Sequence, residues 1–492
     1  MIRRILCTVV MMGVSASVLD AQERRPECAS LTLLRLPDIR ISEAAAVPTA
    51  TTGAVREAHC RVNGIVGTEI RFTLLLPDTW NAKFFMGGGG GFVGSVQNAA
   101  AATVNAGYAT VGTDTGHQGG VTDATWALNN LERQVNFGYL AVHRTAEAAK
   151  AIVAHYYGTA ATRSYFTGCS RGGGQALMEA QRFPDDFDGI IAGAPAYDWT
   201  GIAAQMIGNA QAAFPTRGTT ASMFTAEDLS VVELSVLNAC DGRDGVKDGV
   251  LDDPRQCAFD VNTLPLSDAK KATLRALYAA TTNRDGEIHP GQPFGGEGQR
   301  GGWAAWIVGG APQPPGQQEP SLRFAFGNGI MKYLVFNDPT WDYITYDLSN
   351  WKKDTALAAT FLNATNTDLS AFKARGGKLV LWHGWADPAL TPLASIKYRD
   401  QVFVRDASAS DYLRTFMLPG VLHCNGGPGP DTVDWPAVIA DWVEHGKAPD
   451  RVVARRVVDG TVTRSRPLCV YPKRAAYTGT GSTDDESNFV CR

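Results

Sequence analysis

Short apolar segments with two different spacings alternate along the chain. Apolar residues occupy every second position of residues 70–77, as expected for a strand with one buried face. Between residues 139 and 157 the apolar positions recur at helical spacing instead, and the pattern ends at Gly158. By the same criteria strands are predicted at residues 83–86, 108–112, 164–167, 189–192, 378–382 and 415–419, and helices at residues 172–183, 393–403 and 435–445.

This alternation predicts an α/β fold with a mostly parallel sheet covered by helices. The alternation stops after Trp199, where stretches rich in Asp and Gly or in Gly, Pro and Gln follow, and it resumes near residue 378. We therefore expect one α/β domain interrupted by an insertion. The expected division is residues 22–199 and 346–492 for the catalytic domain and residues 200–345 for the inserted domain.

Composition and charge narrow the class of protein. The 492 residues are 45% hydrophobic and 19% charged, which excludes a disordered, collagenous or coiled-coil chain. With 45 Lys and Arg against 49 Asp and Glu, the net charge is −4, so the charge balance implies no nucleic-acid partner.

The N-terminus predicts export from the cell. Two basic residues, Arg3 and Arg4, precede an apolar run over residues 5–18, and Ala21 is a small residue suited to cleavage. Such a run is shorter than the roughly 20 residues that a membrane-spanning helix needs. We interpret residues 1–21 as a signal peptide of a secreted or periplasmic protein without a membrane anchor.

Cysteine usage agrees with export. Removal of residues 1–21 takes Cys7 away and leaves eight of the nine cysteines. An even number of cysteines in an oxidising compartment favours disulfide bonds over free thiols or zinc ligands. The alternative is a cytosolic protein with scattered buried thiols.

A nucleophile motif stands between a predicted strand and a predicted helix. Residues 168–172 read Gly-Cys-Ser-Arg-Gly and fit the pattern G-x-S-x-G, in which a sharp turn presents the serine hydroxyl. A glycine-rich run at residues 87–91 lies upstream and suits close approach of a substrate. We predict that Ser170 is a nucleophile; a flexible serine loop is the alternative.

A serine nucleophile in this fold needs an acid and then a histidine later in the chain. Asp387 follows the predicted strand 378–382, and His423 lies in a loop just after another strand-like segment. We predict these two residues as the acid and the base. His383 is interpreted as a structural residue of the turn, and His445 as a solvated residue at a helix end.

Two cysteines flank the predicted catalytic residues. Cys169 precedes Ser170 and Cys424 follows His423. A disulfide holds its Cα atoms about 4.4–6.8 Å apart, so a bond between these cysteines would keep the nucleophile and the base close together.

Three motifs together resemble the tannase and feruloyl esterase family, which contains the mono(2-hydroxyethyl) terephthalate hydrolases. They are Gly-Cys-Ser-Arg-Gly-Gly at 168–173, His-Gly-Trp-Ala-Asp-Pro at 383–388 and His-Cys-Asn-Gly-Gly-Pro-Gly-Pro at 423–430. The resemblance implies an α/β-hydrolase fold with a large inserted lid, and a triad of Ser170, Asp387 and His423 supported by a Cys169–Cys424 bond. Gly174 departs from the pattern, because many members carry Arg there.

The resemblance implies pairings for the remaining cysteines as well. Proximity in sequence agrees with it for Cys28–Cys60 and Cys469–Cys491, and Cys240–Cys257 would bracket an acidic loop. A bridge that closes a loop of that size contributes roughly 3 kcal/mol in the chain-entropy model.

The acidic loop is a predicted calcium site. Its carboxylates and glycines suit the hard oxygen ligands and tight turns that Ca²⁺ selects, although the spacing is not that of an EF-hand. A solvated Asp-Gly turn is the alternative, and a calcium ion there would be structural. The resemblance implies as ligands the carboxylates of Asp241, Asp244 and Asp248 and the carbonyls of Val246 and Val250.

These features predict a secreted serine carboxylesterase that hydrolyses small aromatic-acid esters through an acyl-enzyme, of the feruloyl esterase or tannase type. A terephthalate monoester hydrolase is the alternative within the family. The expected oxyanion hole uses the backbone N–H of Arg171 and one from Gly89 or Gly90.

Aromatic residues of the insertion are candidates for the acid pocket or for the lid's own core, and Leu390 is a candidate for either the pocket or a packed turn. The aromatic candidates are Trp303, Trp306, Phe324, Phe326 and Trp341. Two other function classes stay open: a catalytically silent, calcium-stabilised binding protein, against which the intact triad argues, and a peptidase that uses the same triad.

Overall fold

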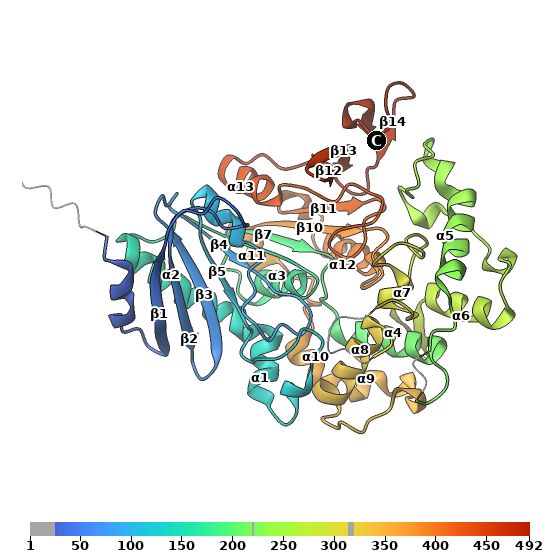
Figure 1. The fold of residues 1–492 in the computed structure, drawn as a ribbon, viewed down its shortest axis with the longest axis horizontal. Coiled ribbons are helices and arrows are strands. Elements are labelled where there is room, and N and C mark those ends of the chain that lie inside the picture. The colour runs from blue at the N-terminus through green and yellow to red at the C-terminus, as the bar shows by residue number, and fades with distance from the viewer. Residues whose placement is uncertain (1–24, 219–220, 313–318) are drawn as a thin grey trace, which may run out of the picture.

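The computed structural model describes residues 25–218, 221–312 and 319–492, and its centre is a nine-stranded sheet (Figure 1). The strand order is β1-β2-β3-β5-β4-β6-β7-β10-β11. Strands from β5 to β11 in this order run parallel, whereas β1, β2, β3 and β5 pair antiparallel. The strands are β1 (Ile39–Val47), β2 (His59–Val66), β3 (Ile70–Pro77), β4 (Lys83–Gly87), β5 (Ala109–Thr113), β6 (Arg163–Cys169), β7 (Gly189–Gly193), β10 (Lys378–Gly384) and β11 (Leu413–Leu418).

Helices cover both faces of the parallel part, which explains why its strands are apolar on both sides. Along β4, Phe84 and Met86 pack into the cluster that contains residues of α2, α3 and α12. Phe85 points to the other face and packs into the cluster that contains Ile439 of α13. The bounds are α2 (Ala141–Tyr157), α3 (Arg171–Arg182), α12 (Pro392–Arg405) and α13 (Trp435–His445).

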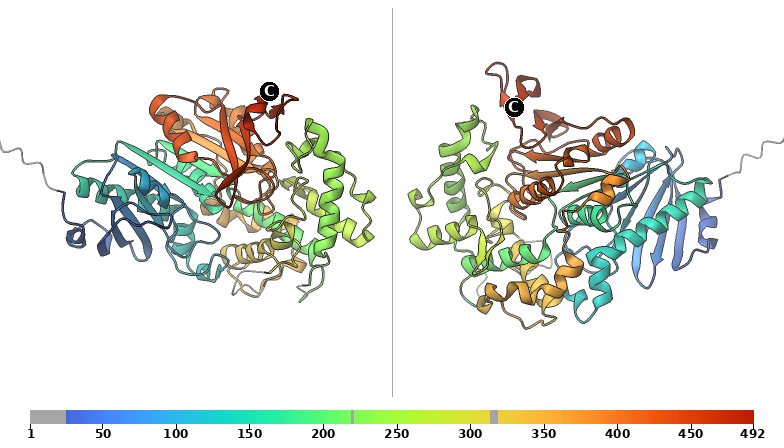
Figure 2. Two further views of the ribbon diagram at one scale, coloured as in Figure 1. Left: turned by 45° about the horizontal axis from the view of Figure 1, so that its top comes forward. Right: turned by 180° about the vertical axis from the view of Figure 1, so that it is seen from behind.

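The chain between β7 and β10 is largely helical, and its described residues contribute no strand to the large sheet. In Figures 1 and 2 its part from α5 to α9 lies on the side of the molecule opposite β1 and β2, whereas α10 and α11 return to the large sheet. It has a core of its own, which includes Leu274 and Trp303. Its elements are α4 (Trp199–Ala213), α5 (Ala226–Cys240), α6 (Asp268–Tyr278), the hairpin β8 (Thr281–Asn283) and β9 (Gly286–His289), α7 (Trp303–Trp306), α8 (Leu322–Gly329), α9 (Trp351–Asp354), α10 (Ala356–Leu362) and α11 (Ser370–Ala374).

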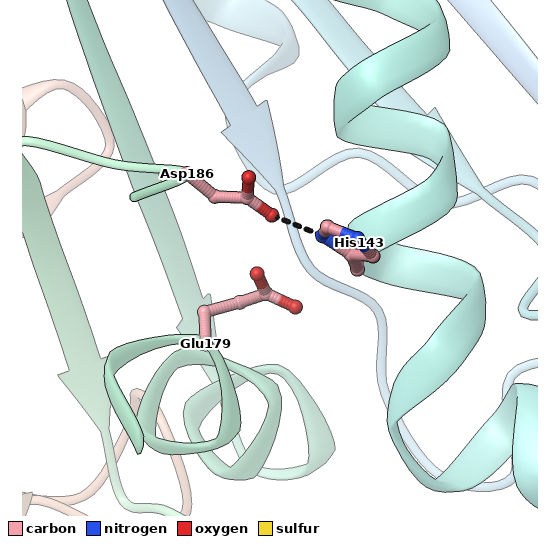
Figure 3. Close-up of side chains that lie close together, drawn as sticks. All are labelled: His143, Glu179 and Asp186. Atoms are coloured by element: carbon pink, nitrogen blue, oxygen red, sulfur yellow. Dashed lines mark hydrogen bonds and ion pairs between the residues drawn. The ribbon is translucent and has the colours of Figure 1, made fainter. Parts of the chain in front are cut away.

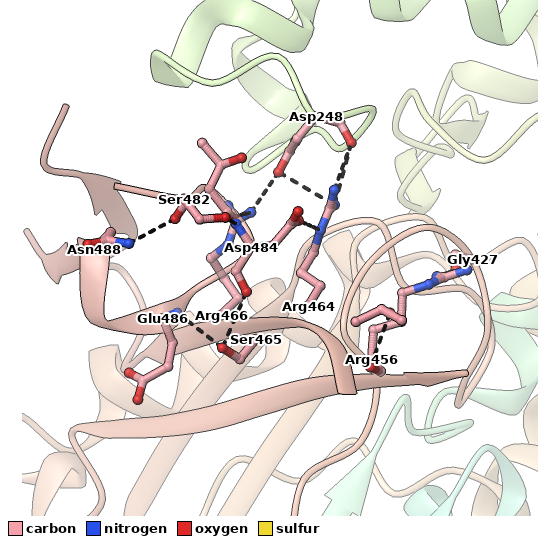
Figure 4. Close-up of polar contacts among 12 residues, drawn as sticks. Asp248, Gly427, Arg456, Arg464, Ser465, Arg466, Ser482, Asp484, Glu486 and Asn488 are labelled. Atoms are coloured by element: carbon pink, nitrogen blue, oxygen red, sulfur yellow. Dashed lines mark hydrogen bonds and ion pairs between the residues drawn. The ribbon is translucent and has the colours of Figure 1, made fainter. Parts of the chain in front are cut away.

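A C-terminal hairpin joins the insertion to the loop that carries His423 (Figure 4). Arg466 Nη2 lies 2.6 Å from Oδ2 of Asp248 in the insertion, and Arg456 donates to the carbonyl of Gly427. The hairpin therefore links the segment between β7 and β10 to the loop that carries His423. Its strands are β12 (Arg451–Val458) and β13 (Thr461–Cys469), and the short pair β14 (Ala475–Tyr477) and β15 (Phe489–Cys491) follows.

The described residues form four disulfides, and they are the pairs that the family resemblance implies: Cys28–Cys60, Cys169–Cys424, Cys240–Cys257 and Cys469–Cys491. The predicted signal peptide, residues 1–21, lies outside the described residues. None of the helices in the described ranges combines the length and the apolar character needed to cross a membrane.

Candidate active site

Ser170 sits in a strained turn between β6 and α3. Its φ of 62° and ψ of −122° are unusual for a residue with a side chain. A Cβ at Gly168 would lie 2.4 Å from the carbonyl carbon of Gly172, so the turn needs a glycine there. The sequence G-x-S-x-G thus forms the tight strand-to-helix turn that presents a serine side chain.

Asp387 and His423 lie at the carboxyl ends of two neighbouring parallel strands, β10 and β11. Asp387 is fully buried, and its Oδ2 lies 2.8 Å from Nδ1 of His423. Its Oδ1 accepts from the backbone N–H groups of Ala389 and Leu390 at 2.7 and 3.0 Å. Although burial favours the neutral acid, His423 and a hydrogen bond from His383 hold the pKa of Asp387 below its usual range.

His383 has a partner that the sequence analysis did not foresee. Its Nε2 lies 3.0 Å from Oδ2 of Asp387 and 3.2 Å from the carbonyl of Leu390, while its Nδ1 lies 2.8 Å from Oγ of Ser395. Asp387 therefore contacts two imidazole rings. The signal in the sequence was the spacing of His383 and Asp387, four residues apart across the end of a strand.

A disulfide holds the backbones of the Ser170 turn and the His423 loop together. The Cα atoms of Cys169 and Cys424 are 6.0 Å apart. Ser170 and His423, the neighbours of these cysteines, both line one cavity of about 420 Å³. The described structure contains no hydrogen bond between the Ser170 hydroxyl and the His423 ring, a contact that often tightens only when substrate binds.

Gly89 and Gly90, one of which is expected in the oxyanion hole, both donate their N–H groups to glutamine side chains. Gly89 N donates to Oε1 of Gln175 at 3.2 Å, and Gly90 N donates to Oε1 of Gln97 at 2.8 Å. Gly91 also lines the cavity, and no backbone carbonyl among the described residues accepts a hydrogen bond from its N–H group. Its φ is +57°, and a Cβ there would lie 2.3 Å from the carbonyl oxygen of Val121, so only glycine fits.

The side chain of Arg171 is an unexpected buried cation. It is 1% exposed, its Nη2 donates to the carbonyls of Phe137 and Gly138, and its guanidinium lies over the rings of Phe137 and Trp199. Burial lowers the pKa of Arg171 to about 9. The sequence motif gave a reason to single out its backbone N–H but not its side chain.

The aromatic candidates divide between the cavity and the core of the segment between β7 and β10. Trp306, Phe326 and Leu390 line the cavity, and the ring of Trp306 meets His423 edge-on with centroids 4.9 Å apart. Trp303 instead lies in the core of the insertion. Phe324 and Trp341 pack beside the apolar cluster next to the cavity and do not line it.

The acidic loop lines a small cavity of about 10 Å³ beside the Cys240–Cys257 bridge. Asp241 and Asp244 line it, together with Asp252, which the sequence analysis did not single out. Burial raises the pKa of Asp252 to about 7, and Asp244 adds to this effect. The other expected ligands, Val246, Asp248 and Val250, are not part of its lining, and Asp248 contacts Arg466.

Three side chains elsewhere in the described chain could hold a metal ion: His143 of α2, Glu179 of α3 and Asp186 (Figure 3). Nδ1 of His143 lies 2.7 Å from Oδ2 of Asp186. Glu179 is fully buried, and burial together with Asp186 raises its pKa well above the ordinary value. These residues do not line the cavity at Ser170.

Comparison with known proteins points to one family. The family model described as "Tannase and feruloyl esterase" matches residues 53–492. An uncharacterized esterase of Xanthomonas campestris pv. campestris is 34% identical, over 100% of this chain and 95% of its own. The mono(2-hydroxyethyl) terephthalate hydrolase of Piscinibacter sakaiensis is 31% identical, over 91% of this chain and 87% of its own.

The fold agrees with a solved structure of the same kind. The crystal structure of feruloyl esterase B from Aspergillus oryzae superposes with a TM-score of 0.85 at 26% identity. The match covers 94% of this chain and 99% of that one.

Proposed function

The chain belongs to the tannase and feruloyl esterase family, a family of carboxylic ester hydrolases with an α/β-hydrolase-like fold, and on that premise we propose that it is a secreted serine esterase of small aromatic-acid esters. The observation that carries the proposal is the Asp387–His423 contact beside the strained Ser170 turn, with Ser170 and His423 on one apolar cavity. The four disulfides support export to an oxidising compartment.

In the proposed reaction Ser170 attacks the ester carbonyl while His423 takes its proton. His423 returns the proton to the leaving alcohol, an acyl-enzyme forms, and water then hydrolyses it with His423 again as the base. Asp387 holds His423 through Nδ1, so that Nε2 faces the reacting groups, and its negative charge stabilises the imidazolium. The lowered pKa of Asp387 keeps it ionised at neutral pH.

The oxyanion hole is assigned to the backbone N–H of Arg171, at the start of α3, and to that of Gly91 in place of Gly89 or Gly90. This revision rests on the hydrogen bonds that already occupy the N–H groups of Gly89 and Gly90. Two such donors placed on the developing oxyanion act where the cavity excludes water, and loss of one typically costs about 2.7–4 kcal/mol of transition-state stabilisation.

A structural Ca²⁺ at the acidic loop is part of the proposal. Support comes from three carboxylates around one small cavity, those of Asp241, Asp244 and Asp252. The negative charges of Asp241 and Asp244 repel each other, and Asp244 raises the pKa of Asp252. A cation would relieve this repulsion, and carbonyls such as that of Val246 would complete the ligand set. Asp248 fits less well as a ligand, because it already contacts Arg466.

The test of the proposed function is turnover of a panel of aromatic methyl esters by the purified protein. A burst of alcohol followed by slower turnover is expected, and Ser170→Ala should abolish both. Ser164→Ala, a serine on β6 outside the cavity, is the matched control and should leave turnover intact. If no ester is hydrolysed by folded wild-type protein, the esterase proposal fails and the silent binding protein gains support; cleavage of peptides alone would favour a peptidase.

A further inference from the structure

Glu179, near the end of α3, has a buried carboxylate without a partner among the described residues. The residue is fully buried, and neither Oε1 nor Oε2 takes part in a hydrogen bond. The nearby cation of Lys150 pairs with Asp186 instead: its Nζ lies 3.9 Å from Oδ1 and donates to the backbone carbonyl. An unpaired charge in a protein interior is costly, so Glu179 must either hold a proton or contact a cation.

Two further side chains of the metal-binding kind face this carboxylate. Figure 3 shows Glu179 pointing toward His143 of α2 and toward Asp186 in the turn before β7. One ligand atom from each of the three residues lies within 4.8 Å of the others, and Nδ1 of His143 lies 2.7 Å from Oδ2 of Asp186. Bonds from nitrogen or oxygen ligands to zinc are about 2.0–2.2 Å long, so small side-chain rotations bring these atoms onto one ion.

The imidazole of His143 has a second carboxylate on its other nitrogen. Nε2 lies 3.5 Å from Oε2 of Glu147, one turn further along α2, and the ring stacks on Phe183 with centroids 3.8 Å apart. When a metal binds Nδ1, the ring proton moves to Nε2, where Glu147 can accept it. A carboxylate behind a ligating histidine is typical of zinc sites, because it fixes the tautomer and the orientation of the ring.

A proton shared by Glu179 and Asp186 is the alternative to a metal ion. Such a proton would satisfy only one oxygen of Glu179, and the other oxygen would stay without a partner. A divalent cation can contact both oxygens and Nδ1 of His143 together. The cluster is also open to solvent, because the side chains of His143 and Asp186 are 22% and 11% exposed.

We propose that His143, Glu179 and Asp186 bind a divalent transition-metal ion of the zinc class and thereby tie α2, α3 and the turn before β7 together. One imidazole nitrogen with carboxylate oxygens favours such an ion over Ca²⁺, which takes oxygen ligands. The site shares no residue with the cavity of the acidic loop. At a rise of about 1.5 Å per residue, Glu179 lies roughly 13 Å from Ser170 along α3, so the ion is structural and does not contact the substrate.

The test is a calorimetric titration of the metal-free protein with Zn²⁺, with excess Ca²⁺ present so that the acidic loop does not compete. We expect one Zn²⁺ per chain, and binding at least about 100-fold weaker in Glu179→Gln and in His143→Gln, since loss of even an outer-shell partner costs about 10–100-fold. Asp244→Asn in the acidic loop and His155→Gln, exposed on α2, are the controls and should bind Zn²⁺ like the wild type. Equal binding by all these variants would overturn the proposal.

Melting temperatures separate metal binding from a shared proton. Zn²⁺ should raise the melting temperature of the wild type and leave that of Glu179→Gln unchanged, because an ion that binds the folded state stabilises it by mass action. Circular dichroism checks that each variant folds, and His143→Gln, at a partly exposed position, takes the place of Glu179→Gln if that variant does not fold. A folded wild type that neither binds Zn²⁺ nor gains stability from it would reject the metal site in favour of the shared proton, and it would leave the proposed esterase unaffected.

Discussion

His383 and Asp387 are joined by a contact of 3.0 Å between Nε2 and Oδ2, on the same carboxylate oxygen that meets His423 at 2.8 Å. Since Asp387 and the Leu390 carbonyl can only accept, Nε2 of His383 must carry the hydrogen. Its Nδ1 then accepts from the Ser395 hydroxyl. The ring is thus fixed in one tautomer and restrains the carboxylate oxygen that also contacts His423.

From this contact we predict that His383 is a positioning residue of the proposed triad. His383→Gln should lower kcat about tenfold, which corresponds to loss of one hydrogen bond to a charged group. The acid limb of the pH–rate profile should also move to higher pH. Without the hydrogen bond from His383 the Asp387 carboxylate is more basic, and it therefore stabilises a protonated His423 more strongly.

The pH profile distinguishes positioning from simple structural support. A loss of kcat without any movement of the acid limb would mean that His383 only stabilises the turn. His445→Gln provides the control, because His445 is exposed at the end of α13 and contacts Asp441. That variant should match the wild type in both kcat and pH dependence.

The parallel part of the sheet could be predicted because its strands carry strong local patterns. Strand β5, which follows the glycine-rich run at residues 87–91, and helices α3 and α13 lie within a few residues of their predicted positions. Strands β1 and β2 were missed: β1 has an irregular pairing between Ile41 and Glu43 and alternates poorly, so its apolar pattern is weak. The C-terminal hairpins were missed for a similar reason, since much of β12 and β13 is exposed.

At the site, sequence order led to the prediction of Ser170, Asp387 and His423, which stays a prediction, and the structure brings Asp387 and His423 into contact. The backbone hydrogen bonds around them were not predictable. The engagement of Gly89 depends on Gln175, which reaches it from α3, and that of Gly90 on Gln97, which lies seven residues along the same loop. The burial of Arg171 likewise depends on Phe137 and Trp199, which meet only in three dimensions. The limits of the inserted domain stay a prediction.

The Cys169–Cys424 bridge should matter more for activity than a disulfide of the periphery. We predict that Cys169→Ala with Cys424→Ala lowers kcat/KM about 100-fold at temperatures where the protein is still folded, because a shift of about 1 Å in the reacting groups can have that effect. Kinetics and circular dichroism on the same samples separate activity from folding.

The matched control is Cys469→Ala with Cys491→Ala, which removes a bridge remote from the cavity. This variant should have a lower melting temperature with kcat within about twofold of the wild type, since a loop of its length contributes about 3 kcal/mol in the chain-entropy model. Equal loss of kcat/KM in both double variants would argue against a positioning role for Cys169–Cys424.

Calcium removal should destabilise the protein if the acidic loop binds the ion. Chelation is expected to lower the melting temperature by several degrees, because an ion that binds only the folded state stabilises it by mass action. Asp244→Asn should have the lowered melting temperature even without chelator, and adding the chelator should change that temperature little. The exposed Asp459→Asn is the control and should behave like the wild type.

The measurement is calorimetry with elemental analysis of the same samples. An unchanged melting curve after complete removal of the metal would contradict the calcium assignment at Asp241, Asp244 and Asp252. Activity at low temperature should persist after chelation, because none of these carboxylates lines the cavity at Ser170.

Acid should destabilise the fold through a buried neutral histidine. His117 is fully buried, stacks on Trp126 and has Nε2 2.8 Å from the carbonyl of Phe92. Burial lowers its pKa from 6.5 to about 4. Between these two values the unfolded chain binds a proton that the folded chain does not, so stability falls as the pH drops from about 6.5 towards 4.

The full effect corresponds to about 3 kcal/mol, since each pKa unit is worth about 1.4 kcal/mol. His117→Gln keeps a donor towards Phe92 but does not titrate, so it should be less stable than the wild type at pH 8 and show a shallower loss between pH 6.5 and 4. His155→Gln, at an exposed position of α2, should keep the wild-type slope. Urea unfolding at several pH values measures this slope, and equal slopes for wild type and His117→Gln would show that other groups cause the acid sensitivity.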